Sequence, residues 1–101
     1  MKLLTNKLRR QIPPLGATEK DADPILWARF FVPGLETAYY PIEFDGINRF
    51  NGLVKALNVE SMSFWLDDLE NWRFSGGRRH VRDRRFRPVR LSQWKASNTC
   101  D

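Results

Sequence analysis

The chain has 101 residues, enough for one domain with a hydrophobic core but too few for two independent cores. Its 42% of hydrophobic residues, including seven Phe and four Trp, predict a folded protein and exclude a disordered tail. A single cysteine, Cys100, excludes an intramolecular disulfide and a cysteine-rich zinc site, and no apolar run approaches the ~18 residues of a membrane span.

The formal charge of +5 is unevenly distributed along the chain. Residues 1–72 carry eight Lys or Arg against ten Asp or Glu, whereas residues 73–101 carry nine against two. The net charges of the two parts are therefore −2 and +7, and the basic character belongs to the C-terminal part.

The first elements are a helix, a loop and a strand. Thr5 can cap a helix that continues to about Gln11, because its hydroxyl can accept a backbone N–H of the first turn. Residues 16–24 are polar and acidic, which is typical of a surface loop. Residues 25–32 are apolar on both alternating faces, which predicts a central strand covered on two sides.

A β-hairpin follows. Residues 38–44 alternate as a strand does, the dipeptide Asp45-Gly46 supplies a turn, and a second strand runs over residues 49–57. Pro41 cannot donate a backbone hydrogen bond, so its strand is expected to be at an edge or bulged there.

The remaining elements complete an antiparallel sheet. Residues 62–66 predict a strand that leads directly into a helix over 67–72, since carboxylates favour a helix start. After a glycine-rich break, residues 81–91 predict a last strand, and a turn at 92–95 returns Trp94 to the body.

We therefore expect an α+β fold with an antiparallel four- to five-stranded sheet, on which an N-terminal helix and a second short helix pack. It forms a single domain over residues 1–101, with a folded core over 1–95 and a frayed C-terminal tail over 96–101. The core is expected to contain most of the aromatic side chains, namely Trp27, Phe30, Phe44, Phe50, Trp65 and Trp72.

Short motifs spread over nearly the whole chain, from residue 2 to about residue 93, are similar to those of one family. They are Leu3-Leu4-Thr5 with Leu8, Pro13-Pro14-Leu15, Glu19, Phe30-Phe31 with Pro33, Glu43-Phe44-Asp45-Gly46, Phe50, Gly52-Leu53-Val54, Phe64, Leu66, Leu69-Glu70, Arg82-Asp83, Phe86, Pro88 and Leu91-Ser92. In this order they resemble the bacterial domain of unknown function 2958, a family encoded largely on plasmids, phages and integrative elements.

The resemblance implies an accessory protein of a mobile genetic element. The single cysteine, and an N-terminus whose apolar residues are interrupted by charges, predict the cytoplasm of the bacterial host cell. The family has no assigned activity to carry over. This chain also departs from the family pattern, because Arg84, Arg85 and Arg87 stand where apolar, aromatic or acidic residues are more usual, and Gly16 replaces an aromatic residue.

The sharpest functional signal is the arginine-rich segment. Guanidinium groups can neutralise phosphates, and aromatic residues between them can stack on bases. The alternative is that arginines only protect an exposed strand edge. The candidate residues for binding a partner or nucleic acid are Arg78, Arg79, Arg82, Arg84, Arg85, Arg87, Arg90, Phe86 and an exposed Tyr39.

Catalytic and metal-binding signals are weaker. His80 is the only histidine and is expected in an exposed loop, with no nucleophile in a recognisable pattern beside it. Glu43 and Asp45 with Asp67 or Glu70 could bind a divalent metal, as in a nuclease, but a solvent-facing strand residue, a turn and a helix start explain them more simply. We therefore assign no catalytic residue, no metal and no cofactor.

Two hypotheses remain. The first is a non-enzymatic counter-defence protein, of the anti-CRISPR or anti-restriction type, that binds a host protein or nucleoprotein complex. The second is a direct DNA- or RNA-binding protein that uses residues 78–90. A metal-dependent nuclease is a minority alternative, and neither main hypothesis involves a membrane.

Overall fold

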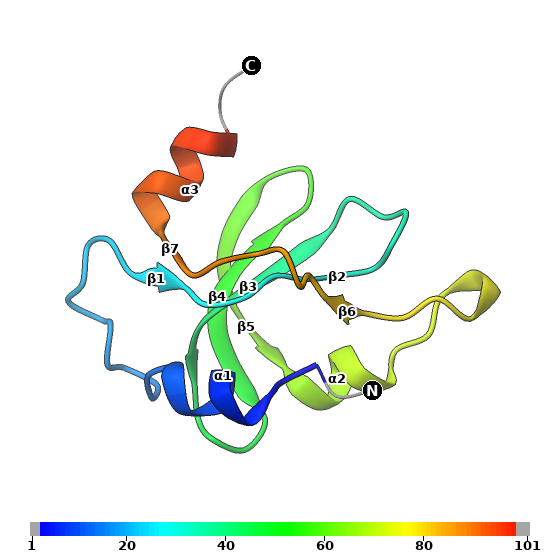
Figure 1. Ribbon diagram of the computed structural model, residues 1–101, viewed down its shortest axis with the longest axis horizontal. Helices are drawn as coiled ribbons and strands as arrows, with labels where there is room; N and C mark the ends of the chain where they lie inside the picture. Colours follow the sequence, from blue (N-terminus) through cyan, green and yellow to red (C-terminus); the bar gives the residue numbers. More distant parts are fainter. Residues whose placement is uncertain (1–2, 99–101) are drawn as a thin grey trace.

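A central antiparallel sheet organises the chain in the computed structural model, which describes residues 3–98 (Figure 1). Five strands form this sheet in the order β5-β4-β3-β2-β6, and β1 and β7 form a separate two-stranded ribbon. The elements, in chain order, are α1 (Asn6–Gln11), β1 (Ile25–Leu26), β2 (Phe30–Phe31), β3 (Ala38–Phe44), β4 (Arg49–Lys55), β5 (Val59–Trp65), α2 (Leu66–Asn71), the 3-10 turn η1 (Ser75–Gly77), β6 (Val81–Arg82), β7 (Val89–Arg90) and α3 (Leu91–Asn98). The α+β fold is as expected.

Two hydrophobic clusters form the core, one on each face of the sheet. The first includes Phe44, Phe50 and Phe64 together with the segments that flank α1 and with α2. The second includes Tyr40 and Leu53 together with Trp94 of α3. In Figure 1, α1 and α2 accordingly lie along the lower side of the sheet, whereas α3 lies at the upper left.

Both short helices begin where local chemistry predicts. The Thr5 hydroxyl accepts the backbone N–H of Leu8 at 3.1 Å and caps α1. The chain passes from β5 into α2 without a loop, and Asn48 holds this junction by accepting the N–H of Leu66 at 2.7 Å and of Asp67 at 2.8 Å. Both helix predictions are confirmed.

The hairpin of β3 and β4 is the longest regular pairing that involves β3, and it contains a bulge. Its register shifts between Pro41 and Glu43. Because β2 and β4 flank β3 on both sides, the missing N–H of Pro41 is accommodated by the bulge and not by an edge. Gly52 lies opposite Pro41, where an added Cβ would stand 2.1 Å from the Tyr40 carbonyl oxygen.

The two predicted continuous strands over residues 25–32 and 81–91 are wrong. Each is divided into two short strands that lie in different sheets, with β2 pairing with β6 and β1 with β7. In the second segment, the loop over residues 83–88 separates β6 from β7. The Asp83 carboxylate accepts the N–H of Arg85 at 2.9 Å and starts a turn, and Pro88 cannot donate to a ladder.

The predictions for three tryptophans have different outcomes. Trp94 packs on Tyr40, with ring centroids 4.9 Å apart, as expected. Trp65 and Trp72 do not lie in the core, since they are 42% and 55% exposed. Trp65 ends the edge strand β5, and Trp72 follows the end of α2 and stacks on Phe74.

The C-terminal segment is more helical than a single turn, because α3 continues to Asn98. The predicted frayed tail thus begins within this helix, and residues 99–101, with Cys100, lie outside the described residues. Over residues 3–98, no helix is both long and apolar enough to cross a bilayer.

Candidate functional site

The structure distributes the arginine-rich segment over three places and does not form one continuous strand. Arg82, Arg84 and Arg87 line one groove. Arg78 and Arg79 lie earlier, between η1 and β6, and Arg90 lies in β7. The structure therefore does not bring all the predicted site residues together.

The groove lies between α1 and the loop over residues 83–88. We call it the basic groove, because its lining includes the cationic side chains of Lys7, Arg82, Arg84 and Arg87. Its volume is about 180 Å³. Lys7 comes from α1, so two segments far apart in the sequence supply the positive charge.

Asp83, the one acidic residue in the lining, is already neutralised. Its carboxylate accepts a hydrogen bond from the Arg29 guanidinium at 3.1 Å and forms an ion pair with it. Both side chains are about a quarter exposed. Within residues 3–98, the four lining cations make no ion pair. The basic groove therefore carries positive charge that no carboxylate of the described chain offsets.

Arg82 has a further unsatisfied group. Its Nε is buried and has no hydrogen-bond partner among the described residues. A buried donor without an acceptor costs on the order of 1–3 kcal/mol. Such groups require an explanation, and one of these is a site that a ligand completes.

Arg78 and Arg79 belong to the excursion between α2 and β6. Arg78 donates to the carbonyl oxygens of Ser75 and Pro33, at 3.2 and 3.5 Å, and so ties the excursion to the turn after β2. Arg79 forms an isolated bridge with Arg73. Arg73, Arg78 and Arg79 are all exposed, and they give this excursion a second group of cations.

Arg90 has a structural use. It forms an ion pair with Asp21 at 3.7 Å and donates to the carbonyl oxygen of Asp23 at 3.0 Å. These bonds fasten the acidic loop to β7. Arg85 is exposed in the 83–88 loop and does not line the basic groove.

The two aromatic candidates are half-buried. Phe86 packs on Tyr40 with centroids 5.7 Å apart and belongs to the edge of the second hydrophobic cluster. Tyr39 contacts Phe64 and His80, each at 5.3 Å, and burial raises the pKa of its hydroxyl. It lines a pocket of about 210 Å³ together with Trp72, Phe74 and His80.

The prediction that His80 lies in an exposed loop is wrong, because only 6% of the residue is exposed. Its Nδ1 lies 3.1 Å from the Leu69 carbonyl oxygen, and since that oxygen can only accept, Nδ1 carries the proton. Burial lowers the pKa of the imidazole, and the bond to Leu69 opposes this shift in part. His80 therefore joins α2 to the sheet as a neutral side chain.

Glu43 is also buried, not solvent-facing as expected, with 5% of its surface exposed. Its carboxylate accepts the backbone N–H groups of Gly16 and Thr18, the Thr18 hydroxyl, and the Asn51 amide. Burial raises the pKa of Glu43, but these hydrogen bonds together outweigh it, so the pKa lies below the ordinary 4.5.

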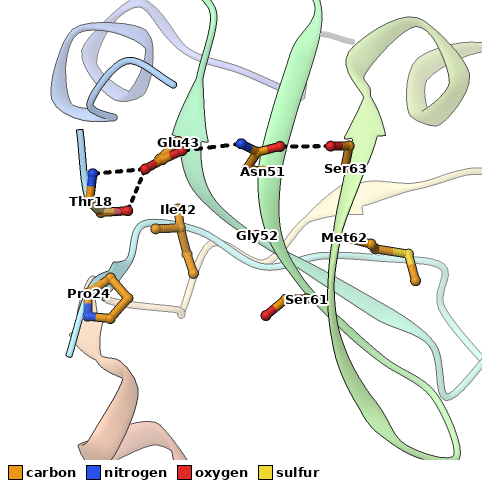
Figure 2. Close-up of a pocket in the computed structure, with 9 residues that line it drawn as sticks. All are labelled: Thr18, Pro24, Ile42, Glu43, Asn51, Gly52, Ser61, Met62 and Ser63. Carbon is orange, nitrogen blue, oxygen red and sulfur yellow. Dashed lines mark hydrogen bonds between the residues drawn. The ribbon is translucent and has the colours of Figure 1, made fainter. Parts of the chain in front are cut away.

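A polar row continues from Glu43 across the sheet. Figure 2 shows Asn51 between Glu43 and Ser63, with one residue from each of β3, β4 and β5. The row forms one side of an open pocket of about 330 Å³. At one end of the row Thr18 donates to Glu43, and at the other end Arg49 donates to the Ser63 hydroxyl. Residues of the chain itself therefore satisfy both ends of the row.

The carboxylates considered for a metal serve separate structural purposes. Asp45 accepts the N–H groups of residues 47–49 and stabilises the hairpin turn, which holds its pKa below the ordinary 3.8. Glu70 accepts the N–H of Leu3 at 3.3 Å. Among residues 3–98, no three His, Cys, Asp or Glu side chains come together as a metal site would require.

Sequence reasoning did not identify Lys7 as a site residue. It is an exposed cation on a short helix, and nothing local distinguishes it from Arg9 or Arg10. Only the packing of α1 beside the 83–88 loop brings it to Arg84 and Arg87. Such a contact between distant segments has no signal in a single sequence.

Comparisons with family models, with curated proteins and with solved structures found no match to this chain. The resemblance to domain of unknown function 2958 therefore stays a prediction from the residues.

Proposed function

We propose that this chain is a non-enzymatic binding protein whose basic groove takes the phosphate groups of a nucleic acid, either free or within a nucleoprotein complex. The observation that carries the proposal is the set of four lining cations, Lys7, Arg82, Arg84 and Arg87, none of them ion-paired within residues 3–98. Guanidinium groups bind phosphates through paired hydrogen bonds, and neutralisation of phosphates by Lys and Arg contributes much of the affinity of proteins for nucleic acid.

The arginines of the basic groove are better explained by binding of a partner than by protection of the β6 edge of the sheet. The adjacent strand β6 has only two residues, so little of the ladder needs protection there. Asp83 is paired with Arg29 and does not offset the other cations. The buried Arg82 Nε, which has no acceptor in the described chain, adds a donor that an anionic ligand could satisfy after a small rotation of the guanidinium group.

The resemblance to the 2958 family adds a biological setting to this proposal. It implies a protein of a phage or plasmid, and the single cysteine favours action in the host cytoplasm. In that setting the partner would be a host defence complex, such as a CRISPR effector or a restriction enzyme, and the basic groove would engage it at its nucleic-acid surface. The chain would then act as a counter-defence protein that inhibits this complex.

Binding can be measured by fluorescence anisotropy with labelled single- and double-stranded oligonucleotides over a range of salt concentrations. With four cations in the basic groove, the slope of log K against log salt is expected between about −3 and −4. Absence of binding to every oligonucleotide at low salt would remove the free nucleic acid as partner.

A matched pair of variants separates the basic groove from overall charge. Arg84 lines the groove and its neighbour Arg85 does not, although both are exposed. At ~0.15 M salt, where the screening length is ~8 Å, Arg84→Glu should weaken binding by about tenfold or more and Arg85→Glu by clearly less. Equal losses would contradict the groove and indicate non-specific attraction.

Capture from a bacterial lysate, with and without nuclease treatment, distinguishes the two forms of partner. A host complex that is retained by the wild type, and lost both with Arg84→Glu and after nuclease treatment, supports a nucleoprotein partner. A protein retained regardless of both would contradict the proposal.

A further inference from the structure

The edge of the sheet opposite the basic groove is a second candidate surface. Within residues 3–98, β5 pairs with β4 alone, so the outer backbone groups of a seven-residue strand have no partner strand. The other edge, β6, is only two residues long. The long open edge is therefore the edge of β5, the strand that leads into α2 in Figure 1.

This edge lacks the features that keep edge strands apart. Its sequence, VESMSFW, contains no Lys, Arg, Pro or Gly, its pairing with β4 has no bulge, and its one charge is Glu60. Monomeric proteins usually protect long edges with such residues. An unprotected edge of this length indicates a strand that pairs with another.

The exposed apolar side chains of β5 are symmetrically spaced. Val59, Met62 and Trp65 are 43%, 42% and 42% exposed. Val59 and Trp65 stand three residues before and after Met62. An antiparallel pairing of the strand with itself around Met62 would place Met62 beside its counterpart on one face of the sheet, and Val59 beside the second copy's Trp65 on the opposite face.

We propose that β5 pairs with β5 of a second copy of this chain, around a two-fold axis at Met62, to form a continuous ten-stranded sheet. Met62 then lies opposite its counterpart, Val59 opposite the second copy's Trp65, and Ser61 opposite its Ser63. Glu60 lies opposite the second copy's Phe64, so the two carboxylates do not face each other across the strands.

The surroundings of β5 have room for the added strand. On one face the strand borders the pocket of about 330 Å³ that Ser61 and Ser63 help to line, and on the other face a hollow of about 300 Å³ that Leu57 and Glu60 help to line. Alternate side chains of a paired strand point to opposite faces and would enter these two spaces. A second copy fits better than a charged peptide. Glu60 is the one charged residue of β5, so the strand has little charge with which to attract a peptide of opposite sign.

The oligomeric state of the intact chain tests the proposal, measured by sedimentation equilibrium over a wide range of concentrations. The wild type is expected to form a dimer. Met62→Glu places two carboxylates beside the axis and should raise the dimer dissociation constant by at least about tenfold. Ile47→Glu, which also introduces a carboxylate at an apolar side chain, lies 80% exposed in the turn between β3 and β4 and lines neither space, so it is the control and should dimerise normally.

The register has its own test, which does not depend on a disruptive charge. In a Cys100→Ser background, Met62→Cys should form a covalent dimer on oxidation, because residues opposite each other in a ladder approach closely enough for a disulfide. Ile47→Cys, in the turn between β3 and β4, should not. A wild type that is monomeric at every concentration overturns the proposal, as does a dimer that survives Met62→Glu and gives no cross-link at position 62.

Discussion

At the scale of single residues, Gly52 shows how closely β3 and β4 approach at the bulge. A Cβ on Gly52 would overlap the Tyr40 carbonyl oxygen, which belongs to the backbone and cannot rotate away. We expect Gly52→Ala to lower the free energy of unfolding by about 3 kcal/mol, measured by urea denaturation. Ser61→Ala on the neighbouring, exposed part of β5 is the control. A loss below about 1 kcal/mol would mean that the bulge can relax.

His80 makes stability depend on pH. Its pKa is lowered below the ordinary 6.5 in the folded chain, mainly by burial, so the unfolded chain binds the proton more readily. Stability is therefore fully present above pH 6.5 and is lost as pH falls below it. Thermal unfolding at pH 7.5 and at pH near 5 should show the decrease.

The His80→Asn variant isolates this effect, since its amide can still donate to Leu69 but does not titrate. Its stability should be lower at neutral pH and nearly constant over the same interval. Tyr39, which contacts the ring, titrates only above its ordinary value of 10.0, and the carboxylates with lowered pKa, Glu43, Asp45 and Asp23, lose stability only below 4.5. An equal decrease in the variant would assign the effect to another group.

At the scale of elements, Glu43 ties the loop over residues 13–24 to the sheet. It satisfies two backbone N–H groups of that loop, and removing it takes the charged acceptor away from these partly buried donors. We expect Glu43→Ala to cost about 3 kcal/mol and Glu43→Gln less, because the amide keeps one acceptor. Glu36→Ala, at an exposed position, is the control in the same unfolding measurement.

Limited proteolysis should localise the effect of Glu43→Ala. Lys20 is exposed in the loop, so trypsin cleavage after it should accelerate when the anchor is lost. Cleavage after Arg85, in a loop that Glu43 does not contact, should change little. Uniform acceleration at both positions would indicate global unfolding and not release of one loop.

The elements that the sequence predicted correctly are those with local signals. The Thr5 cap, the Asp45-Gly46 turn and the passage from β5 into α2 each depend on neighbouring residues, and each is present. The predicted continuous strand over residues 81–91 failed because its pairing depends on residues 25–31, at least fifty positions away. Alternation of side chains in one segment cannot reveal where its partner interrupts it.

The candidate site was predictable to a similar extent. Composition located the positive charge in the C-terminal part, and three of its arginines do share a groove. It could not separate Arg90, which pairs with Asp21, from Arg84, which has no ion pair within residues 3–98. Nor could it find Lys7, because the contact between α1 and the 83–88 loop arises only from packing.

At the scale of the whole molecule, the two edges of the sheet have different chemistry. The β6 edge adjoins the basic groove, whereas the β5 edge exposes Val59, Met62 and Trp65. Four inter-strand spacings separate β5 from β6 in the sheet order, which corresponds to roughly 19 Å. This exceeds both the ~8 Å screening length at physiological salt and the distance over which substitutions usually couple.

The two surfaces should therefore be separable by mutation. We expect Arg84→Glu with Arg87→Glu to abolish oligonucleotide binding and leave the dimer dissociation constant unchanged, because neither residue touches β5. Met62→Glu should produce a monomer that binds a short oligonucleotide with the affinity of one wild-type protomer. Anisotropy and sedimentation on the same preparations measure both properties. If Met62→Glu also weakened binding to a short oligonucleotide by about tenfold, the basic groove would require the second copy, and the view of two independent edges would be wrong.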